Sequence, residues 1–403
     1  MSDGRVVITG LGPIASVGVG REGFWNALLE GRDGSSDVSS FGTSEFKVHR
    51  ACELDDERLL GHSARPVQRD DPGRASLLAV EAARLALEDA GLEPPPHDAG
   101  VIVGTTGGEI QVLEHMHSAR LEGREEALPA GEFAKHPCHV ISRNVANAFG
   151  LRGPNQVVPT ACAAGNYAVS IARGWVQAGY TDVVLAGGCD PLSRVAFTGF
   201  ARLGAIAPEF CRPFDRERQG LLIGEGAGMV VVESLRSAQR RGAHIYAEVA
   251  GVGFSCDAHH MTMPQPEGRG ITLAMERALR DARLGAEAID YVSAHGTGTK
   301  ANDKIESAAV RALLGDHTAP VSSIKSMIGH TMGAASALET IACCLAIESG
   351  SIPPTIHHEH PDPECNVDVV PNEARDHRVD VALNNAFAFG GNNSCLVLTG
   401  LRS

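Results

Sequence analysis

Two kinds of segment recur in the same order in both halves of the chain, and this repetition constrains the fold more than any other feature. Helical patterns rich in Ala and Leu, at 85–92 and 277–284, each precede a short strand pattern that ends in Gly and Thr. Helical patterns of small residues, at 163–179 and 334–350, each close with Gly. The two pairs are offset by about 190 and about 171 residues, which predicts an internal duplication.

Buried strands alternate with helices along both halves, which predicts an α/β fold with sheets covered by helices. The strand patterns are continuous apolar runs such as VVITGLG, DVVLAGG, GMVVVE, YVSAHG and CLVLTG. The helical patterns lie near 75–92, 163–179, 235–241, 271–283, 303–314 and 333–349. The halves meet near residue 245 without a Ser-rich or charged linker, so we expect units 1–245 and 246–403 to form one compact body.

Charge and cysteine usage exclude several classes of function. Acidic residues outnumber basic ones by 49 to 35, and this balance disfavours nucleic-acid binding. We find no secretory signal pattern and no run of 18 apolar residues, so we expect neither export nor a membrane span. The ten Cys residues form no CxxC pair, which favours reduced thiols in a cytoplasmic protein.

Cys162 is the candidate nucleophile, because it opens a helix of small residues directly after a strand-like run. Unpaired N–H groups at a helix start carry partial positive charge, so we expect a lowered thiol pKa there. The same N–H groups are suited to an oxyanion hole. A buried structural Cys is the alternative interpretation. Cys189 is a weaker competitor, because no Ala-rich helix follows it.

His295 and His330 each follow a strand-like run and lie in a Gly-rich turn. A neutral histidine in such a turn can donate a hydrogen bond or move a proton, although a structural role is as compatible with either residue alone. The other His clusters, at 259–260 and 357–360, lie among Pro and Asp, which indicates loops. We therefore predict no bound metal.

Several ordered motifs resemble the β-ketoacyl-ACP synthase family, above all the synthase II type and the ketosynthase subunits of type II polyketide systems. The resemblance covers the chain from residue 6 to residue 400. The motifs that carry it are TACAAGN around Cys162, AHGTGT with Asp303 and Glu306, SIKSMIGH with Lys325, Glu339, and NAFAFGGNN at 385–393.

The resemblance implies the decarboxylative Claisen condensation that lengthens fatty-acid or polyketide chains. Cys162 would take an acyl group from a carrier-protein thioester. His295 and His330 would stabilise the enolate that malonyl-carrier protein forms on losing CO2. Lys325 would order the histidines, and Glu339 would pair in the same network.

The resemblance also assigns residues around the nucleophile. The backbone N–H groups of Cys162 and Phe389 would form the oxyanion hole, and the Phe389 side chain would gate the acyl chain. Thr297 and Thr299 would bind the phosphopantetheine arm, and Phe200 would contribute to substrate binding. Without the resemblance, turn and core roles are the simpler interpretation of Thr297, Thr299 and Phe389.

The family fold is the thiolase-like five-layered α-β-α-β-α arrangement, which agrees with the duplication. The implied partners are an acyl carrier protein and a second subunit, in a homodimer or in a heterodimer with a ketosynthase-like chain. No tightly bound cofactor is implied, since substrates arrive on phosphopantetheine. One departure is Ala388, where the family often has Gly, and we expect it to stiffen the gate loop. Another is the polar segment 133–147, which suggests an unusual acyl substrate, a heterodimeric partner or simply a solvated surface helix.

Three other functions are weighed against the elongating enzyme. Non-catalytic chain-length subunits lack the nucleophile, whereas this chain keeps Cys162 and both histidines. Degradative thiolases use a second Cys near the C-terminus, but here the matching turn is FGG and Cys395 lies on the last strand pattern. An initiating synthase of the Cys/His/Asn type is disfavoured, because both partners here are His.

Overall fold

The computed structural model describes residues 4–55, 73–124, 126, 128 and 131–401. Within these residues one 12-stranded sheet runs through the molecule, in the order β13-β11-β10-β15-β16-β9-β1-β8-β7-β5-β6, with β2 paired to β1. Its strands are β1 (Val6–Ala15), β2 (Gly18–Val19), β5 (Gly100–Gly104), β6 (Asn155–Val158), β7 (Val183–Asp190), β8 (Gly226–Ser234), β9 (Ala247–Cys256), β10 (Tyr291–Ser293), β11 (Pro320–Ser322), β13 (Asp368–Val369), β15 (Val381–Phe387) and β16 (Asn392–Thr399).

The sheet consists of two equivalent halves that meet at β1 and β9. From the centre outward, β1-β8-β7-β5-β6 matches β9-β16-β15-β10-β11, with the first two pairings antiparallel and the last two parallel in each half. Only two residue pairs, Val7 with Glu248 and Ile8 with Ala247, join β1 to β9. The repeated topology confirms the internal duplication.

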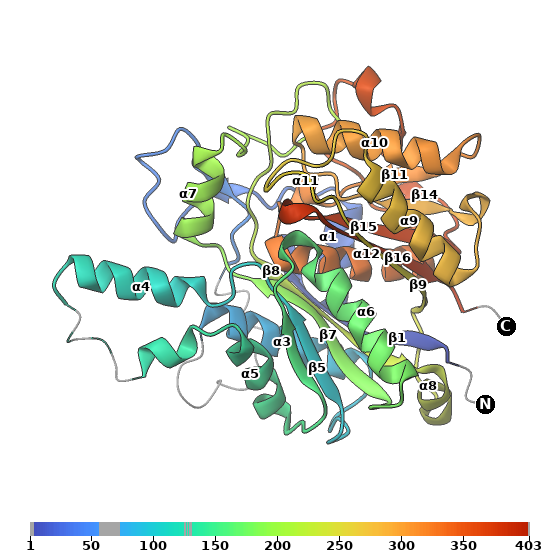
Figure 1. Cartoon of the computed structure of the whole chain (residues 1–403), viewed down its shortest axis with the longest axis horizontal. Helices are drawn as coiled ribbons and strands as arrows, with labels where there is room; N and C mark the ends of the chain where they lie inside the picture. The colour runs from blue at the N-terminus through green and yellow to red at the C-terminus, as the bar shows by residue number, and fades with distance from the viewer. Residues whose placement is uncertain (1–3, 56–72, 125, 127, 129–130, 402–403) are drawn as a thin grey trace.

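Helices complete a five-layered arrangement around the two half-sheets (Figure 1). The middle layer is α6 (Ala164–Gln177) and α12 (Ala335–Ser349), which pack on each other and on strands of both halves. The outer layers contain α3 (Arg74–Asp89), which covers β1, β8 and β7, and α9 (Arg269–Ala282), which covers β9 and β16. The predicted α-β-α-β-α fold is therefore confirmed.

The two outer helices approach their strands so closely that glycine is required. A Cβ atom at Gly12 of β1 would lie 1.9 Å from the carbonyl oxygen of Ala82, and one at Gly253 of β9 would lie 2.0 Å from that of Ala274. No side chain fits at such distances, so the same helix-on-strand contact is built into both halves.

The remaining elements lie at the edges or on the connections. The helices are α1 (Gly20–Leu29), α4 (Ile110–Leu121), α5 (His139–Phe149), α7 (Arg194–Arg202), α8 (Leu235–Arg241), α10 (Lys300–Leu314) and α11 (Lys325–Ile328). Two short ribbons pair β3 (Ser36–Asp37) with β4 (Arg50–Ala51) and β12 (Ser351–Ile352) with β14 (Arg375–Asp376). The proposed boundary between units 1–245 and 246–403 falls between α8 and β9, and it stays a proposal.

The central helix α12 is unusually apolar. The segment Met332–Ser349 has the length and composition of a membrane span, with a mean hydropathy of 1.3, but 83% of it is buried inside the protein. Its position between the half-sheets explains this composition, because a helix covered on all sides needs no polar face.

Candidate active site

Cys162 lies where the chain turns from β6 into α6. The turn is a single 3-10 turn, η3 (Ala161–Ala163), and Ala161 adopts a left-handed φ of 50°. Only glycine adopts this conformation without strain, so the surrounding structure must hold Ala161 in place. The result is a sharp turn that presents Cys162, 5% exposed, at the start of the middle layer.

The second half contains an equivalent 3-10 turn 171 residues later, again with a residue in the left-handed conformation. There η5 (Met332–Ala334) leads into α12, and Met332 has a φ of 52°. His330 lies just before this turn and is held along its backbone. Its N–H donates to the Leu222 carbonyl at 2.7 Å, and its carbonyl accepts from the N–H of Gly224 at 3.0 Å.

The fold brings the three predicted reactive residues together. Three atoms lie within 4.8 Å of one another: the sulfur of Cys162, one ring nitrogen of His295 and one ring nitrogen of His330. All three residues are buried. The two imidazole rings meet edge to face with their centroids 5.5 Å apart. The predicted grouping of a thiol with two imidazoles is present.

Hydrogen bonds set the protonation of both rings. The N–H of Met332 donates to Nδ1 of His330 at 3.2 Å. Lys325 Nζ lies 3.5 Å from Nδ1 of His295, and an ammonium can only donate. Because each Nδ1 accepts, each neutral ring carries its proton on Nε2.

Burial keeps both imidazoles neutral. It lowers the pKa of His295 well below the usual value, and the charge of Lys325, followed by the proximity of His330, lowers it further. Burial, followed by the charge of Lys325, does the same to the pKa of His330. Two neutral N–H donors are suited to stabilising a developing oxyanion.

The cluster does not fit a resident metal. In metal sites the second ring nitrogen usually donates to a carboxylate or carbonyl, which leaves the ligating nitrogen unprotonated. Here N–H groups face both Nδ1 atoms, and the Lys325 ammonium adds a positive charge beside the site.

A buried ion pair supports the histidines. Lys325 Nζ donates to Glu339 Oε1, and both side chains are inaccessible to solvent. Burial raises the pKa of Glu339 to about 7, and the nearby Lys325 opposes this rise. A second carboxylate, Glu306, accepts from the backbone N–H groups of His295 at 2.7 Å and Gly296 at 2.8 Å. The backbone that carries His295 is thereby fixed.

The predicted lowering of the Cys162 pKa is wrong. Burial raises the pKa of this thiol to about 11, although Lys325 and the backbone N–H groups of Phe389 and Cys162 itself lower it. Desolvation of the thiolate therefore outweighs the partial charge at the helix start. The same two N–H groups face the sulfur, where the resemblance places an oxyanion hole.

Alkylation of Cys162 should therefore show no plateau near neutral pH. Because the pKa lies above that of a free thiol, we expect the rate with iodoacetamide to rise about tenfold per pH unit from pH 7 to pH 9. Mass spectrometry of the labelled peptide measures this rate. A rate that levels off below pH 8 would contradict the neutral resting thiol.

Phe389, the expected gate residue, and Phe200 are stacked on each other. Phe389 belongs to η7 (Phe389–Gly391) and is 37% exposed, and its ring centroid lies 5.5 Å from that of Phe200 in α7. Ala388 has extended backbone angles that any residue adopts, so replacing Gly there imposes no strain. The left-handed positions are Gly390 and Gly391, with φ of 86° and 79°.

Thr297 and Thr299 lie in the loop that follows His295, and their side chains contact each other. Their hydroxyl oxygens are 2.9 Å apart. Asp303 holds this loop by accepting from the N–H groups of Thr297 at 3.1 Å and Gly298 at 3.2 Å.

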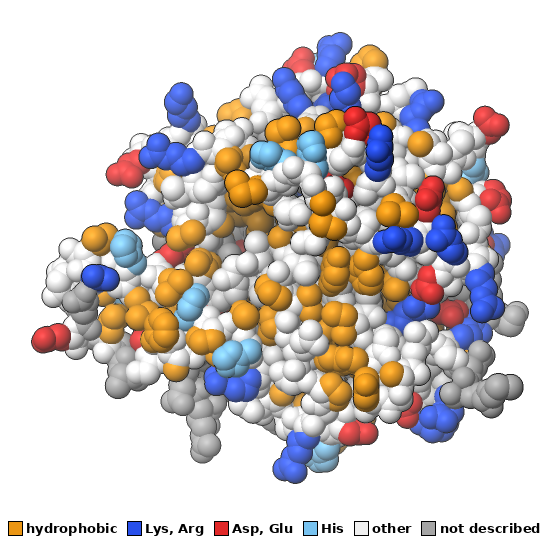
Figure 2. All heavy atoms as spheres, in the orientation of Figure 1, with side chains coloured by type: hydrophobic (Ala, Val, Ile, Leu, Met, Phe, Trp, Pro, Cys, Tyr) orange, Lys and Arg blue, Asp and Glu red, His pale blue; other side chains and the backbone are white. Residues whose placement is uncertain are grey.

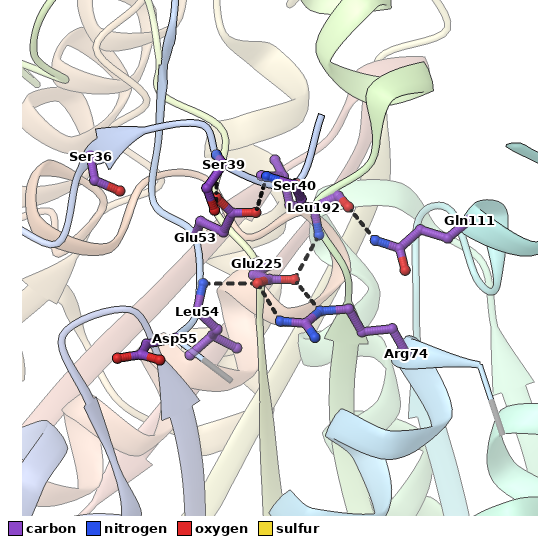
Figure 3. Close-up of a pocket in the computed structure, with 10 residues that line it drawn as sticks. All are labelled: Ser36, Ser39, Ser40, Glu53, Leu54, Asp55, Arg74, Gln111, Leu192 and Glu225. Carbon is purple, nitrogen blue, oxygen red and sulfur yellow. Dashed lines mark hydrogen bonds and ion pairs between the residues drawn. The ribbon is translucent and has the colours of Figure 1, made fainter. Parts of the chain in front are cut away.

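A network that the sequence did not reveal anchors the segment behind His330. Figure 3 shows Glu225 at its centre, in a cavity of about 600 Å³ between the N-terminal segment and α3. Glu225 accepts from the N–H groups of Leu54 at 2.8 Å and Leu192 at 3.0 Å, and it forms an ion pair with Arg74. The N–H of Gly224, the residue before Glu225, donates to the carbonyl of His330. The network around Glu225 therefore also helps to hold the backbone that carries His330.

The other Cys and His residues considered in the sequence analysis lie outside the cluster of Cys162, His295 and His330. Cys189 is fully buried in β7, and burial raises its pKa well above the usual value. Cys395, the Cys nearest the C-terminus, is buried in the core beneath α9. His260 Nδ1 accepts from the N–H groups of Thr262 and Met263, as expected of loop chemistry.

Comparisons with known proteins agree with this geometry. The model of the β-ketoacyl synthase N-terminal domain matches residues 3–238, and that of the C-terminal domain matches residues 246–359. The chain therefore belongs to the β-ketoacyl synthase family. It is an enzyme, an acyltransferase that forms carbon–carbon bonds between acyl groups.

The similar proteins come from different pathways. The chain is 41% identical to nodulation protein E of Rhizobium sp. (strain N33), with 98% of each chain covered. It is 41% identical to the tetracenomycin polyketide synthase ketoacyl synthase alpha subunit of Streptomyces glaucescens (98% and 96% covered) and 39% identical to 3-oxoacyl-[acyl-carrier-protein] synthase 2 of Coxiella burnetii (99% of each).

Solved structures match over the whole length. The ishigamide ketosynthase/chain length factor superposes with a TM-score of 0.94 at 45% identity, covering 99% of each chain. A type II polyketide ketosynthase in complex with its acyl-carrier protein superposes with a TM-score of 0.90 at 31% identity, again covering 99% of each chain.

Proposed function

We propose that this chain elongates an acyl group by decarboxylative condensation with malonyl-acyl-carrier protein, with Cys162, His295 and His330 as its catalytic residues. The observation that carries the proposal is the placement of a thiol within 4.8 Å of two imidazoles. Both imidazoles are neutral and hold their protons on Nε2. A single oxyanion can contact both donors beside the sulfur.

Acylation comes first. The Cys162 sulfur attacks the thioester carbonyl of an acyl-carrier protein, the C–S bond to phosphopantetheine breaks, and the thiol proton passes to the departing sulfur. A neutral resting thiol is compatible with this exchange, because no net charge is created. The N–H groups of Cys162 and Phe389 stabilise the tetrahedral oxyanion.

Condensation follows. The Nε2–H groups of His295 and His330 donate to the thioester oxygen of the malonyl group, so that loss of CO2 leaves an enolate with stabilised charge. The enolate carbon bonds to the acyl carbon as the bond from that carbon to the Cys162 sulfur breaks, and the sulfur leaves as a thiolate that takes a proton from solvent. Lys325 and Glu339 act as positioning residues, because they contact the histidine network rather than the substrate.

Thr297 and Thr299 would bind the phosphopantetheine arm. We expect Thr299→Val to raise KM for the carrier-protein substrate about fivefold with kcat little changed, because the loss of one hydrogen bond costs about 1 kcal/mol. Steady-state kinetics at varied malonyl-carrier concentrations measure this. An unchanged KM would place the arm elsewhere.

The second subunit would cover the face that carries α6. Figure 2 shows apolar side chains over this region and over the projecting α4. On α6, Tyr167, Ile171 and Trp175 remain partly exposed, and beside it β6 has neighbours on one side only among the described strands. A homodimer or a heterodimer with a ketosynthase-like chain would bury this face. We place the enzyme in the cytoplasm, in fatty-acid or type II polyketide synthesis.

Intact-mass spectrometry tests the proposal. The enzyme is incubated with acyl-carrier thioesters, with and without a candidate partner subunit, and then with malonyl-carrier protein. We expect a mass increase equal to the acyl group on Cys162, which disappears when malonyl-carrier protein is added. Persistence of the acyl-enzyme, with no longer product on the carrier, would contradict the proposal.

A further inference from the structure

Asp190 ends β7 beneath the reactive cluster, where its buried carboxylate joins three separate segments. Its Oδ1 accepts from the Thr105 hydroxyl at 2.7 Å and the N–H of Gly107 at 2.8 Å. Its Oδ2 accepts from the N–H of Thr106 at 2.7 Å and that of Gly333 at 2.6 Å. Each oxygen has two donors, which is the arrangement that suits an ionised carboxylate.

The bond to Gly333 reaches the turn that sets the state of His330. Gly333 follows Met332, whose φ of 52° aims its N–H at Nδ1 of His330. A Cβ atom at Gly333 would lie 2.7 Å from Asp190 Oδ2 and 2.6 Å from the Thr105 Cα. The strained turn is therefore held between the ends of β5 and β7.

We propose that Asp190 is a positioning residue for the condensation, which fixes the turn that keeps the His330 proton on Nε2. Burial is the main reason that the pKa of Cys162 is raised, and the negative charge of Asp190 adds a smaller contribution in the same direction. The other groups that face this sulfur are His295, His330 and Lys325. Asp190 thus acts on both steps of the reaction. It disfavours the thiolate form of Cys162, and it orders His330, which donates a hydrogen bond to the enolate.

This inference rests on the proposed roles of Cys162 and His330, so the test includes one readout that needs no substrate. Asp190→Asn keeps the shape of the side chain and removes its charge. We expect a several-fold faster alkylation of Cys162 by iodoacetamide at pH 8, because the opposing charge is gone. In the same variant, malonyl-carrier decarboxylation should fall about tenfold, because the turn that directs the Met332 N–H at His330 loses a hydrogen bond to a charged group.

These opposite changes distinguish positioning from general loosening. A loosened site would admit the bulkier N-ethylmaleimide preferentially, so we expect the ratio of N-ethylmaleimide to iodoacetamide rates to stay unchanged. Glu109→Gln is the matched control, since Glu109 is a buried carboxylate that accepts backbone N–H groups at the start of α3. It should leave both readouts near the values of the unaltered enzyme.

Three outcomes would overturn the inference: unchanged decarboxylation in Asp190→Asn, unchanged or slower alkylation, or a raised ratio of the two reagents. If Asp190→Asn does not fold, as judged by its thermal transition, Thr105→Val carries the test, because it removes one donor to Asp190 and keeps the charge. It should slow decarboxylation by a smaller factor, and a rate equal to that of the unaltered enzyme would overturn the inference. If decarboxylation is absent even in the unaltered enzyme while alkylation responds as expected, the proposed function fails and the link from Asp190 to Cys162 stands.

Discussion

Replacement of Cys162 by Ala is expected to abolish acyl transfer and condensation, with a loss on the order of 10⁴-fold or more, as for removal of a catalytic nucleophile. The sulfur is the atom that holds the acyl group between the two half-reactions, and Ala leaves no group to replace it. Because Cys162 is small and the neighbouring residues are Ala, the fold should tolerate the change. Intact-mass detection of the acyl-enzyme, together with product formation on the carrier protein, measures the loss.

Cys189→Ala is the matched control for this experiment. Cys189 is also a fully buried thiol on the same half of the chain, but it lies outside the reactive cluster. This variant should still become acylated on Cys162. Acylation that persists in Cys162→Ala and is lost in Cys189→Ala would reverse the assignment of the nucleophile.

Replacement of either active-site histidine is expected to separate the two half-reactions. In His295→Ala and His330→Ala, decarboxylative condensation should fall by about 10²–10³-fold, the cost of one oxyanion donor, while acylation of Cys162 changes much less. In the proposed mechanism, backbone N–H groups hold the oxyanion of acylation, whereas the enolate needs the imidazoles. Radiolabelled CO2 release from malonyl-carrier protein and intact-mass analysis measure the two steps separately.

His358→Gln serves as the control for the histidine variants. His358 is buried, and burial lowers its pKa as well, but it is not a member of the cluster. Both half-reactions should proceed normally in this variant. A histidine variant that condenses at the unaltered rate would remove that residue from the mechanism.

Much of the fold could be predicted from the sequence because its local patterns are strong. The buried strands β1, β7 and β8 are continuous apolar runs, and the helices α3, α6 and α12 are rich in Ala. β15 was missed, because its sequence VALNNAF places two Asn residues in the core. The side-chain nitrogen of Asn384 donates there to Asn166, Ser336 and Thr340 of α6 and α12, which are remote in sequence.

The grouping of Cys162, His295 and His330 could also be expected from sequence, since all three occur in short Gly- and Ala-rich motifs and the fold brings them together. Their protonation states could not be, because each depends on partners brought in by the fold. The thiol was expected to be acidic from its place at a helix start, yet burial raises its pKa to about 11. The supporting roles of Asp190 and Glu225 could not be predicted, because their hydrogen-bond partners are remote in sequence.

The chain's own order of residues thus determined which chemistry is available: one sulfur, two imidazoles, and the duplicated frame on which they are carried. Tertiary structure alone decided how that chemistry is tuned. Electrostatic free energies depend on distance and solvent exposure, and these were set only when segments far apart in sequence closed around the site. The proton on each imidazole is fixed by an N–H or ammonium donor, and that contact exists only in the folded molecule.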